Sequence, residues 1–464
     1  MKISHSQATN NNMTATMEVG VAIVDITPKS PIRLSGFAAR TKSEADKVLH
    51  KLSAKAIAFG SNDQDKTILI AVEIIGIQLA VTGRVAEIIS KEIGIKPEQI
   101  AILVTHTHGS PEVGNLLNIL QCRGDYPSEY FFNSSLLSLD ELIHIAEFNE
   151  FLVKKLADVA IAAFNNRKPA SVSWGKGEVS FAENRRTKGG PVDHSLPVLC
   201  ITNLDGSLRA IVAKYACHGI SLGSDINQIH GDWMGEAQSI IEERHPGCVA
   251  MMVIGCAGDL HPVRRNKVEF MKEYGKDIAD EVDRVISSDL IPLNTPPKAT
   301  MEWIKLPFAR VPTIKWLIEK SKDTGIRGFY SRLALERILR GDSIPKELNY
   351  PIQIWNFDNK MAMINLGGEA VVDYAYLFKQ KYGGERVWIN SYANDVSCYI
   401  PSLRILKEGG YEGETSMYWY NQPSPFAETI EQKVAGKVNR LMPSVFRNKS
   451  KRGKGMKIPV STTN

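Results

Sequence analysis

The chain has 464 residues, which is long enough to bury a large hydrophobic core and to form roughly two to four domains of average size. Its hydrophobic content of 43% and charged content of 23% are ordinary for a soluble globular enzyme. The net charge of +5 is small and no basic stripe contains interleaved aromatic residues, so nucleic-acid binding is not expected. The most apolar stretch, Thr67–Val81, contains polar residues and is too short to span a bilayer, so no transmembrane segment is expected.

The two ends of the chain are predicted to be disordered. Residues 1–17 are polar and lack the apolar segment of a secretory signal, and residues 441–464 form a basic tail. As given, the chain therefore predicts a cytoplasmic protein; a signal removed beforehand would place it in the periplasm or outside the cell. The six cysteines contain no CxxC pair and are predicted to be buried thiols.

The clearest predicted unit lies between residues 66 and 108. Residues 66–72 form a continuous apolar run rich in β-branched side chains, which is typical of a strand covered on both faces. A helix over residues 81–93 follows, with Gly94 in the position of a C-terminal cap, and residues 100–104 form a second buried strand. This order predicts a right-handed βαβ unit and a partly parallel sheet.

The same order of elements returns between residues 208 and 256. A strand over residues 208–216 is followed by a helix that ends near His245, and then by a strand over residues 249–254. The remaining predicted elements are a long helix over residues 268–286, strands near residues 299–307, 352–357 and 361–366, and a helix over residues 369–381. The predicted fold class is therefore α/β, with mixed, partly parallel sheets covered by helices.

One large catalytic domain over residues 18–440 is the simplest organisation. Residues 308–350 are helical in pattern and charged, and they are predicted to be an insertion packed at the rim. Residues 109–148 carry few periodic signals and are predicted to form a loop or lid beside the site.

Polar side chains that could carry chemistry follow the predicted strands at their carboxyl ends, where the active groups of open α/β sheets gather. His106 and His108 follow one strand, and residues two apart on an extended segment project to the same side. This pair suits either one metal ligand and one base, or two ligands. His218 follows a second strand, and Glu369 lies between a strand and a predicted helix, where it would be in the first helical turn.

Each of these features alone has an ordinary structural explanation, such as a surface turn, a core histidine or a carboxylate favoured by a helix dipole. Together, at successive strand ends, they predict a site of two imidazoles and a carboxylate. Such a set is a familiar ligand shell for catalytic zinc with one open position, although iron or manganese accepts the same ligands.

The motifs and their order resemble the catalytic domain of neutral ceramidases, from residue 20 to about residue 420. Near the start, Asp25-Ile-Thr-Pro28 and Leu34-Ser-Gly-Phe37 are similar to the family's GDxTxP and MxGY segments. His106-Thr-His108 with Ser110-Pro111 is similar to THTHSGPGG, and Asn184-Arg185-Arg186 is similar to NRSP.

The later segments continue this resemblance in the same order. His218-Gly219, with Gly231-Asp232 and Gly235, is similar to HGTSM…SxDNxGYA, and Gly258-Asp259-Leu-His-Pro262 is similar to GDxSP. Gly368-Glu369 resembles PGE, and the stretch from Tyr392-Ala-Asn394 through Tyr399 to Tyr411-Glu412 resembles GxxNxYxxYxTT…YE.

The resemblance implies a zinc ion held by four residues, which are His106, His218, Glu369 and Tyr399. It implies His108 as the general base or proton shuttle, with Arg185 and Tyr411 stabilising charge on the substrate carbonyl. It also places Asp259 and His261 among the substrate-binding residues. The implied reaction is attack of a metal-activated water on an amide, or an ester, of a small-molecule or lipid N-acyl substrate.

The chain departs from the family in two places. His261 stands where the family has serine in GDxSP, and an imidazole is larger, titrates near neutrality and could bind a metal or an anionic group. The chain also ends about 50 residues after Tyr411, whereas ceramidases continue into a C-terminal β-sandwich domain, which is therefore expected to be lacking. Ceramide itself is not specified as the substrate.

Two other interpretations compete with this one. A metal-dependent hydrolase on a (β/α)₈ barrel also places an HxH pair after a strand, but normally after its first strand. A non-catalytic metal- or ligand-binding relative would retain the ligands, with His261 filling the open position.

Overall fold

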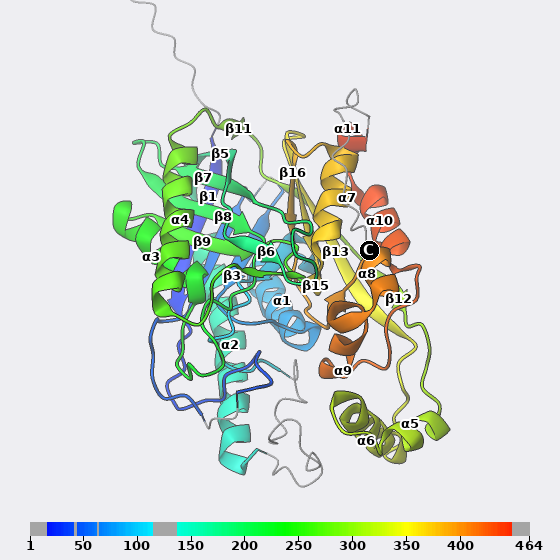
Figure 1. Cartoon of the computed structure of the whole chain (residues 1–464). Helices are drawn as coiled ribbons and strands as arrows, with labels where there is room; N and C mark the ends of the chain where they lie inside the picture. Colours follow the sequence, from blue (N-terminus) through cyan, green and yellow to red (C-terminus); the bar gives the residue numbers. More distant parts are fainter. Residues whose placement is uncertain (1–15, 41–43, 63–64, 115–136, 448–464) are drawn as a thin grey trace, which may run out of the picture.

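The computed structural model describes residues 16–40, 44–62, 65–114 and 137–447. Two β-sheets face each other, and helices cover the outer face of each sheet (Figure 1). In this view α3 and α4 lie at the left of the larger sheet, and α7 and α10 lie at the right of the smaller one. The predicted mixed α/β fold class is confirmed.

The larger sheet has nine strands within the described residues, eight of which follow one path while β11 pairs with β5. In spatial order the strands are β4 (Ile100–Val104), β3 (Thr67–Val72), β2 (Ser53–Phe59), β1 (Met17–Asp25), β5 (Lys168–Glu178), β7 (Ser195–Thr202), β8 (Leu208–Tyr215) and β9 (Val249–Ile254), with β11 (Ile291–Leu293) beside β5. The β3–β4 and β8–β9 pairs are parallel and the other pairs are antiparallel. This topology is not a (β/α)₈ barrel, because such a barrel contains only parallel neighbours.

The smaller sheet and two short ladders complete the strand structure. The smaller sheet contains β12 (Lys298–Pro307), β13 (Glu347–Phe357), β14 (Met361–Leu366) and β16 (Val387–Asn390). One ladder pairs β6 (Ala182–Asn184) with β10 (Leu260–Pro262), and the other pairs β15 (Glu369–Ala370) with β17 (Tyr399–Ile400). Both ladders lie at the functional site described below.

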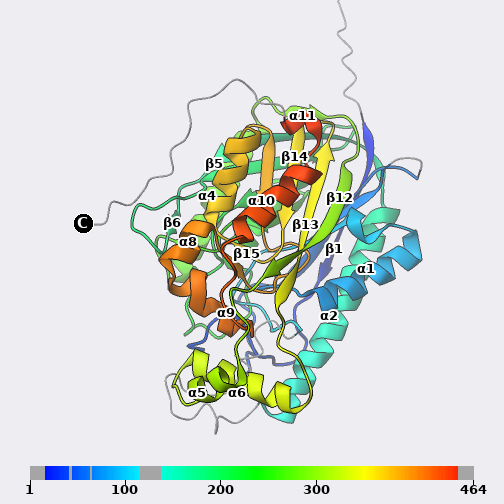
Figure 2. The same cartoon turned by 90° about the vertical axis from the view of Figure 1, so that its right-hand side faces the viewer.

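The helices are distributed over both outer faces (Figure 2). Their bounds are α1 (Leu79–Ile93), α2 (Leu139–Asn165), α3 (Asp232–Arg244), α4 (Val268–Ile286), α5 (Ile314–Lys320), α6 (Ile326–Leu339), α7 (Val372–Tyr382), α8 (Leu403–Glu408), α9 (Ser416–Trp419), α10 (Ile430–Leu441) and α11 (Ser444–Arg447). Gly94 adopts the left-handed conformation after α1, as its sequence position indicates. None of the helices in the described ranges is both long and apolar enough to cross a membrane.

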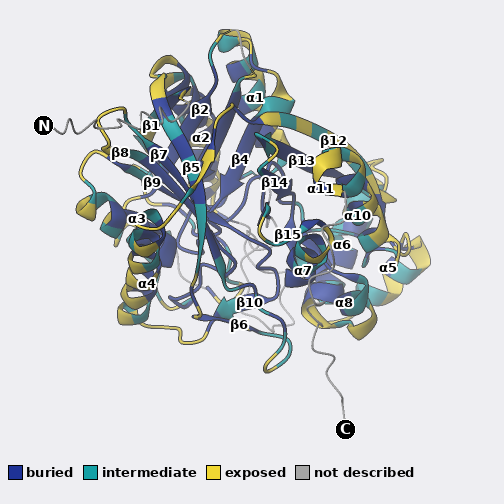
Figure 3. Ribbon diagram, turned by 90° about the horizontal axis from the view of Figure 1, so that it is seen from above, coloured by how far each residue is buried: buried dark blue, intermediate teal, exposed yellow. Residues whose placement is uncertain are grey.

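The core is layered because strand side chains alternate between the two faces of each sheet. On β3, Ile68 and Ile70 pack toward the helices, whereas Leu69 belongs to the cluster between the sheets. The smaller sheet contributes Trp355 to that inner cluster, and its ring meets the Phe59 ring edge-on with centroids 6.4 Å apart. Buried strands at the centre, with exposed positions on the outer helices, are seen from above in Figure 3.

Several boundaries differ from the sequence prediction. Residues 139–148, expected to belong to a loop or lid, are the first turns of α2; residues 115–136 lie outside the described part of the chain. A capping box explains this start, because Ser138 Oγ accepts from Glu141 N at 3.2 Å and Glu141 Oε2 accepts from Ser138 N at 2.9 Å. The predicted helical insertion contains α5 and α6, but residues 347–350 already belong to β13.

Both predicted disordered ends contain ordered residues. Met17 begins β1, and residues 444–447 form α11, whose Phe446 side chain is buried. Residues 1–15 and 448–464 lie outside the described residues. Of the six cysteines, Cys122 is also outside them, and the other five are buried free thiols as predicted.

A buried ion-pair cluster ties α7 to the larger sheet. Asp193 accepts from Lys214 Nζ at 3.0 Å and also from Lys379 Nζ, and the Lys214 side chain is 1% exposed. Burial favours the neutral acid, but the two lysines outweigh it and hold the pKa of Asp193 well below its usual range. The cluster therefore contains one more cation than anion.

Replacing Asp193 with alanine is expected to lower the free energy of unfolding by about 3–5 kcal/mol, because it leaves two ammonium groups without their carboxylate. Denaturant titration of the folded protein measures this loss. Asp205→Ala is the matched control, because Asp205 is in an exposed turn and its removal is expected to change the stability much less. Equal losses in the two variants would contradict the assigned role.

Candidate metal centre and active-site pocket

The candidate site forms where four strands end. His106 and His108 follow β4, His218 follows β8, the segment 255–261 follows β9, and Glu369 follows β14. Because β3 and β4, and likewise β8 and β9, run parallel, the ends of β4, β8 and β9 lie at one edge of the larger sheet, and Glu369 comes to this edge from the smaller sheet. The structure therefore brings together His106, His108, His218 and Glu369, the residues that the sequence places at strand ends.

Two very short backbone pairings align the candidate ligands. Thr107 pairs with Gly219 in an isolated parallel bridge, and His108 N donates to Gly219 O at 3.1 Å. This places the HxH pair beside His218. In the β15–β17 ladder Glu369 stands directly opposite Tyr399. Glu369 is therefore a strand residue and not in the first turn of a helix as predicted, since α7 begins only at Val372.

Gly219 is required for this close approach of chains. A Cβ atom on Gly219 would lie 2.8 Å from His106 O and 2.6 Å from the terminal methyl group of Met234. A side chain there would force the two loops apart and move the imidazoles away from each other.

The donor atoms of the four predicted ligands, together with that of His108, lie close to one another. Glu369 Oε2 is 3.3 Å from His106 Nε2 and 3.3 Å from His218 Nε2. The Tyr399 hydroxyl is 3.4 Å from His218 Nε2, and His108 Nε2 is 3.4 Å from His106 Nε2. All five side chains are at least nine-tenths buried.

The backbone fixes the proton of two imidazoles on the nitrogen that faces away from the cluster. His106 Nδ1 bonds to Ile75 O at 2.5 Å, and His218 Nδ1 bonds to Ala257 O at 2.8 Å. A carbonyl can only accept, so Nδ1 is the donor and each Nε2 directs a lone pair at the centre. His106 also adopts a left-handed backbone with φ of 61°, which is uncommon outside glycine and marks a constrained position.

This arrangement fits a divalent metal ion. Two imidazole lone pairs and a carboxylate oxygen facing one another at these distances repel unless a cation lies between them. Ligands about 2.0–2.1 Å from a tetrahedral zinc ion are separated by about 3.3–3.4 Å, which matches the observed spacing. Imidazoles anchored through their other nitrogen to carbonyl groups are also typical of metal sites.

His108 has the geometry of a ligand as well as that of a base. The possible ligand atoms of His106, His108 and His218 all lie within 4.8 Å of one another, so the three imidazoles form a metal-binding group on their own. Burial, followed by the two neighbouring imidazoles, holds the pKa of His108 well below its usual range. Its ring is therefore neutral at pH 7, and both roles predicted for the HxH pair fit the structure.

Glu369 is held by two tyrosines that the sequence analysis did not nominate. The Tyr392 hydroxyl donates to Glu369 Oε2 at 3.2 Å, and the Tyr420 hydroxyl donates to Oε1. Burial alone would raise the pKa of Glu369, but His106 and His218 outweigh it and hold this pKa well below its usual range. The carboxylate is therefore ionised. Tyr392 has a φ of 58° in the loop after β16, a signal that appears only in the structure.

Arg185 lies beside the ligands and is firmly positioned. Its side chain donates to the Tyr399 hydroxyl at 3.0 Å, to Gly258 O at 2.8 Å and to Glu412 Oε1 at 2.7 Å. Its guanidinium carbon lies 5.6 Å from the centroid of the Tyr411 ring, and the Tyr411 and Tyr399 rings meet edge-on. The structure thus brings Arg185 and Tyr411 to the candidate metal centre, while Glu412 is a positioning residue that sequence reasoning did not assign.

The two predicted substrate-binding residues differ in location. His261 lines the pocket, but its Nε2 pairs with Glu183 Oε1 at 3.1 Å and it is not part of the imidazole group. The non-catalytic alternative places His261 in the open metal position, whereas here His261 lies outside the group of possible ligands and is paired with Glu183. Asp259 is fully buried and does not line the pocket, and its substrate-binding role stays a prediction. Its carboxylate accepts from Val372 N and Asn184 Nδ2 and so anchors the start of α7.

The cluster forms part of the wall of a cavity of about 770 Å³. Its apolar lining includes Phe37, Ala38, Ile75, Ile220 and Trp419, and its charged lining includes Arg185, Arg186, Arg265, Glu408 and Glu412. Trp419 of α9 lines the pocket. The helical insertion packs against α9, where the Tyr330 ring of α6 contacts the Tyr418 ring with centroids 5.3 Å apart. The pocket thus combines a candidate metal centre with apolar and charged surfaces, as small-molecule sites commonly do.

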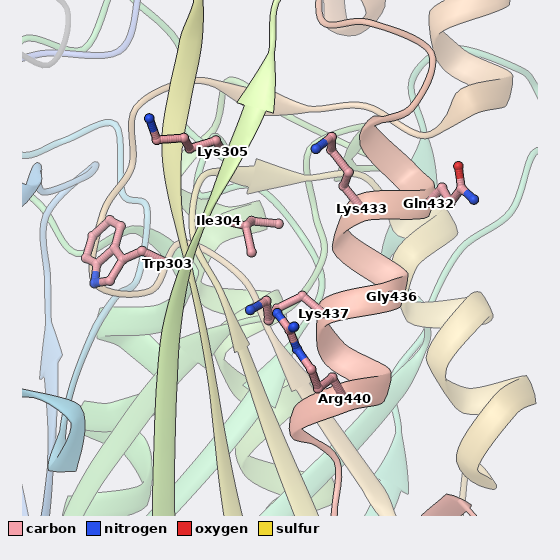
Figure 4. A pocket seen from close by; sticks show the side chains of 8 residues that line it. All are labelled: Trp303, Ile304, Lys305, Gln432, Lys433, Gly436, Lys437 and Arg440. Carbon is pink, nitrogen blue, oxygen red and sulfur yellow. The ribbon is translucent and has the colours of Figure 1, made fainter.

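A second hollow of about 600 Å³ lies between β12 and α10 (Figure 4). Lys437 and Arg440 of α10 reach toward the strand, and both pair with Glu302. Lys305 pairs with Glu347 at 2.5 Å. Among the described residues, the lining of this second hollow contains no histidine, cysteine or carboxylate. The hollow therefore offers no comparable site for chemistry.

Comparison with known proteins identifies the fold. No protein-family model matches the sequence, and no curated protein sequence matches it at a significant level. Among solved structures, a ceramidase complexed with C2 matches with a TM-score of 0.68 and 15% sequence identity, over 91% of this chain and 74% of that chain. The neutral ceramidase from Pseudomonas aeruginosa matches with a TM-score of 0.67 and 16% identity, over 91% and 73% of the two chains.

The protein is therefore a mixed α/β protein of the ceramidase fold class. In particular, the chain has a neutral-ceramidase-like fold, as the motif resemblance indicated. At this level of identity the comparison establishes the fold, and the chemistry has to be argued from the site itself.

Proposed function

We propose that the chain is a zinc-dependent, ceramidase-like hydrolase that cleaves the amide bond of an N-acyl substrate. The observation that carries this proposal is the convergence of His106, His218, Glu369 and Tyr399 on one point in the wall of the pocket. Arg185 stands beside that point and donates to the Tyr399 hydroxyl. The fold shared with ceramidases supports the same class of reaction.

The residues around the centre suit amide hydrolysis. A bound divalent metal would supply an acidified water and would polarise the substrate carbonyl. His108 is neutral and directs Nε2 toward the cluster, so it can take the proton of the attacking water and pass it to the departing nitrogen. Arg185 and Tyr411 donate to the oxyanion that forms at the carbonyl oxygen. The new bond joins the water oxygen to the carbonyl carbon, and the bond that breaks is the amide C–N bond.

The pocket supports an N-acyl substrate. Phe37 contacts the His108 ring, with ring centroids 4.7 Å apart, and Ile75 O accepts a hydrogen bond from His106 Nδ1. Together with Ala38 and Ile220 they give an apolar surface near the metal centre, which suits an acyl chain. We propose either a small-molecule or a lipid amide on this basis, with ceramide as one member of the class.

The metal-free protein is expected to be inactive, and addition of one equivalent of zinc is expected to restore release of fatty acid from N-acyl amides. The assay uses a panel with one acyl chain and several amines, including sphingosine, and measures the released acid and amine. Omission of zinc with the same protein is the control. Absence of release by a folded protein that has bound one zinc ion would overturn the proposed function.

A further inference from the structure

One cation in the pocket wall has no carboxylate partner. Arg185 and Arg186 both pair with Glu412. Arg265 also lines the pocket, and its side chain makes no hydrogen bond or ion pair with any residue in the described ranges. It lies in the exposed segment between β10 and α4, which Asn266 N anchors by donating to Ser221 O at 2.7 Å. A guanidinium held at a pocket wall without a partner is available to a ligand.

The carboxylates of the pocket are already engaged. Glu369 faces two imidazoles, Glu412 holds two arginines, and Glu408 pairs with Arg186 at 3.2 Å and Arg404 at 2.9 Å. None of these contacts neutralises Arg265. A divalent cation at the candidate centre would add further positive charge. The three arginines and the three glutamates of the lining balance, so with such a cation bound the cavity would have a net positive charge and would favour a ligand that carries a negative charge.

His261 adds a second polar group on the same side. It belongs to β10, whose ladder with β6 sets it opposite Glu183, and it stands four residues before Arg265. Its side chain is 13% exposed and lines the pocket. His261 and the unpaired guanidinium of Arg265 are therefore the two polar groups that this part of the wall offers to a ligand.

We propose that the substrate is an N-acyl amino acid and that Arg265, with His261 beside it, binds its carboxylate. This inference rests on the proposed function and specifies the amine that the hydrolase releases. A guanidinium presents two parallel N–H donors that match the planar carboxylate. The apolar side chains Phe37, Ala38 and Ile75 come from other elements and receive the acyl chain. Hydrolysis then gives a fatty acid and a free amino acid.

Two substrates that differ only in charge test this proposal. N-Lauroylglycine and N-lauroylglycinamide share the acyl chain and the scissile amide, but only the first has a carboxylate. With the zinc-loaded protein, kcat/KM is expected to be at least about tenfold higher for N-lauroylglycine, mainly through a lower KM. Arg265→Gln is expected to abolish this preference, and Arg265→Lys to keep part of it.

Arg264→Gln is the matched control, because Arg264 is the adjacent exposed arginine, pairs with Glu273 and does not line the pocket. It is expected to retain the full preference. Equal or faster cleavage of the glycinamide by the unmodified protein would overturn the inference and leave the hydrolase proposal intact. Faster cleavage of N-dodecylglutaramic acid, which carries the charge on the acyl side, would overturn the assignment to an amino acid.

Binding separates failure of the inference from failure of the proposed function. Calorimetry measures the affinity of both lauroyl compounds for the zinc-loaded protein, whether or not cleavage occurs. Tighter binding of N-lauroylglycine that depends on Arg265, without cleavage, would support the carboxylate site and overturn the hydrolase. No difference in binding and no cleavage would overturn both.

Discussion

Replacing Glu369 with alanine is expected to lower the affinity of the protein for zinc by more than about 100-fold and to abolish hydrolysis. Mutation of a residue that merely orients a ligand typically costs about 10–100-fold in metal affinity, so loss of a ligand costs more. Glu369 is also the only ionised carboxylate of the described residues that faces both His106 and His218. Elemental analysis after dialysis against a weak chelator measures the retained metal.

Glu73→Gln is the matched control for this variant. Glu73 is a buried carboxylate at the end of β3 that accepts from Ser53 and Gln238 and lies outside the imidazole group. It is expected to keep its metal. Circular dichroism confirms that each variant is folded. Retention of one zinc ion with unchanged affinity by Glu369→Ala would show that the ligand assignment is wrong.

Replacing Arg185 with alanine is expected to lower kcat by about 100-fold or more while the bound metal is retained. The guanidinium donates to the Tyr399 hydroxyl at the candidate metal centre, where charge would develop on the carbonyl oxygen in the proposed reaction. Loss of a single well-placed oxyanion donor typically costs about 3 kcal/mol of activation free energy, which corresponds to this decrease. Steady-state kinetics on the best amide of the panel, with metal analysis of the same sample, checks both parts.

Arg186→Ala provides the comparison. Arg186 shares Glu412 with Arg185, but it donates to Glu408 and Gly409 and makes no hydrogen bond to Tyr399 or to the imidazoles in the described part of the chain. Its effect on kcat is expected to be less than about tenfold. Loss of zinc by Arg185→Ala would assign Arg185 to holding Tyr399, and an unchanged kcat would remove it from the reaction.

The parts of the fold that follow local rules could be predicted from the sequence. The strands β3, β4 and β9 are almost continuous apolar runs, β8 has an apolar centre, and α1 and α4 have clear helical periodicity. The structure confirms the strands and helices of both βαβ units and the positions of His106 and His218 at strand ends. These features depend on neighbours within a few residues, so periodicity and capping residues contain the information.

The rest of the site depends on contacts between distant segments. Tyr399 reaches the centre only because β17 pairs with β15, and Tyr420 reaches Glu369 across 51 positions of sequence. A strand of two residues, such as β17, and a single contact of the Tyr420 hydroxyl produce no periodic pattern in the sequence. The hydrogen bond from Val372 N to Asp259 is a further example, since it ties the segment after β9 to the start of α7 across 113 positions of sequence. The motif resemblance supplied Tyr399, which residue chemistry alone did not.

The candidate ligands come from both the larger and the smaller sheet, so metal binding would also affect how firmly the two sheets are held together. His106 and His218 extend from the larger sheet, whereas Glu369 follows a strand of the smaller one and is paired with Tyr399. An ion at this point would be bound by ligands from both sheets and would link them to each other. The free energy of metal binding would then also stabilise the packing of the two sheets. The proposed catalytic ion would thus contribute to the stability of the fold.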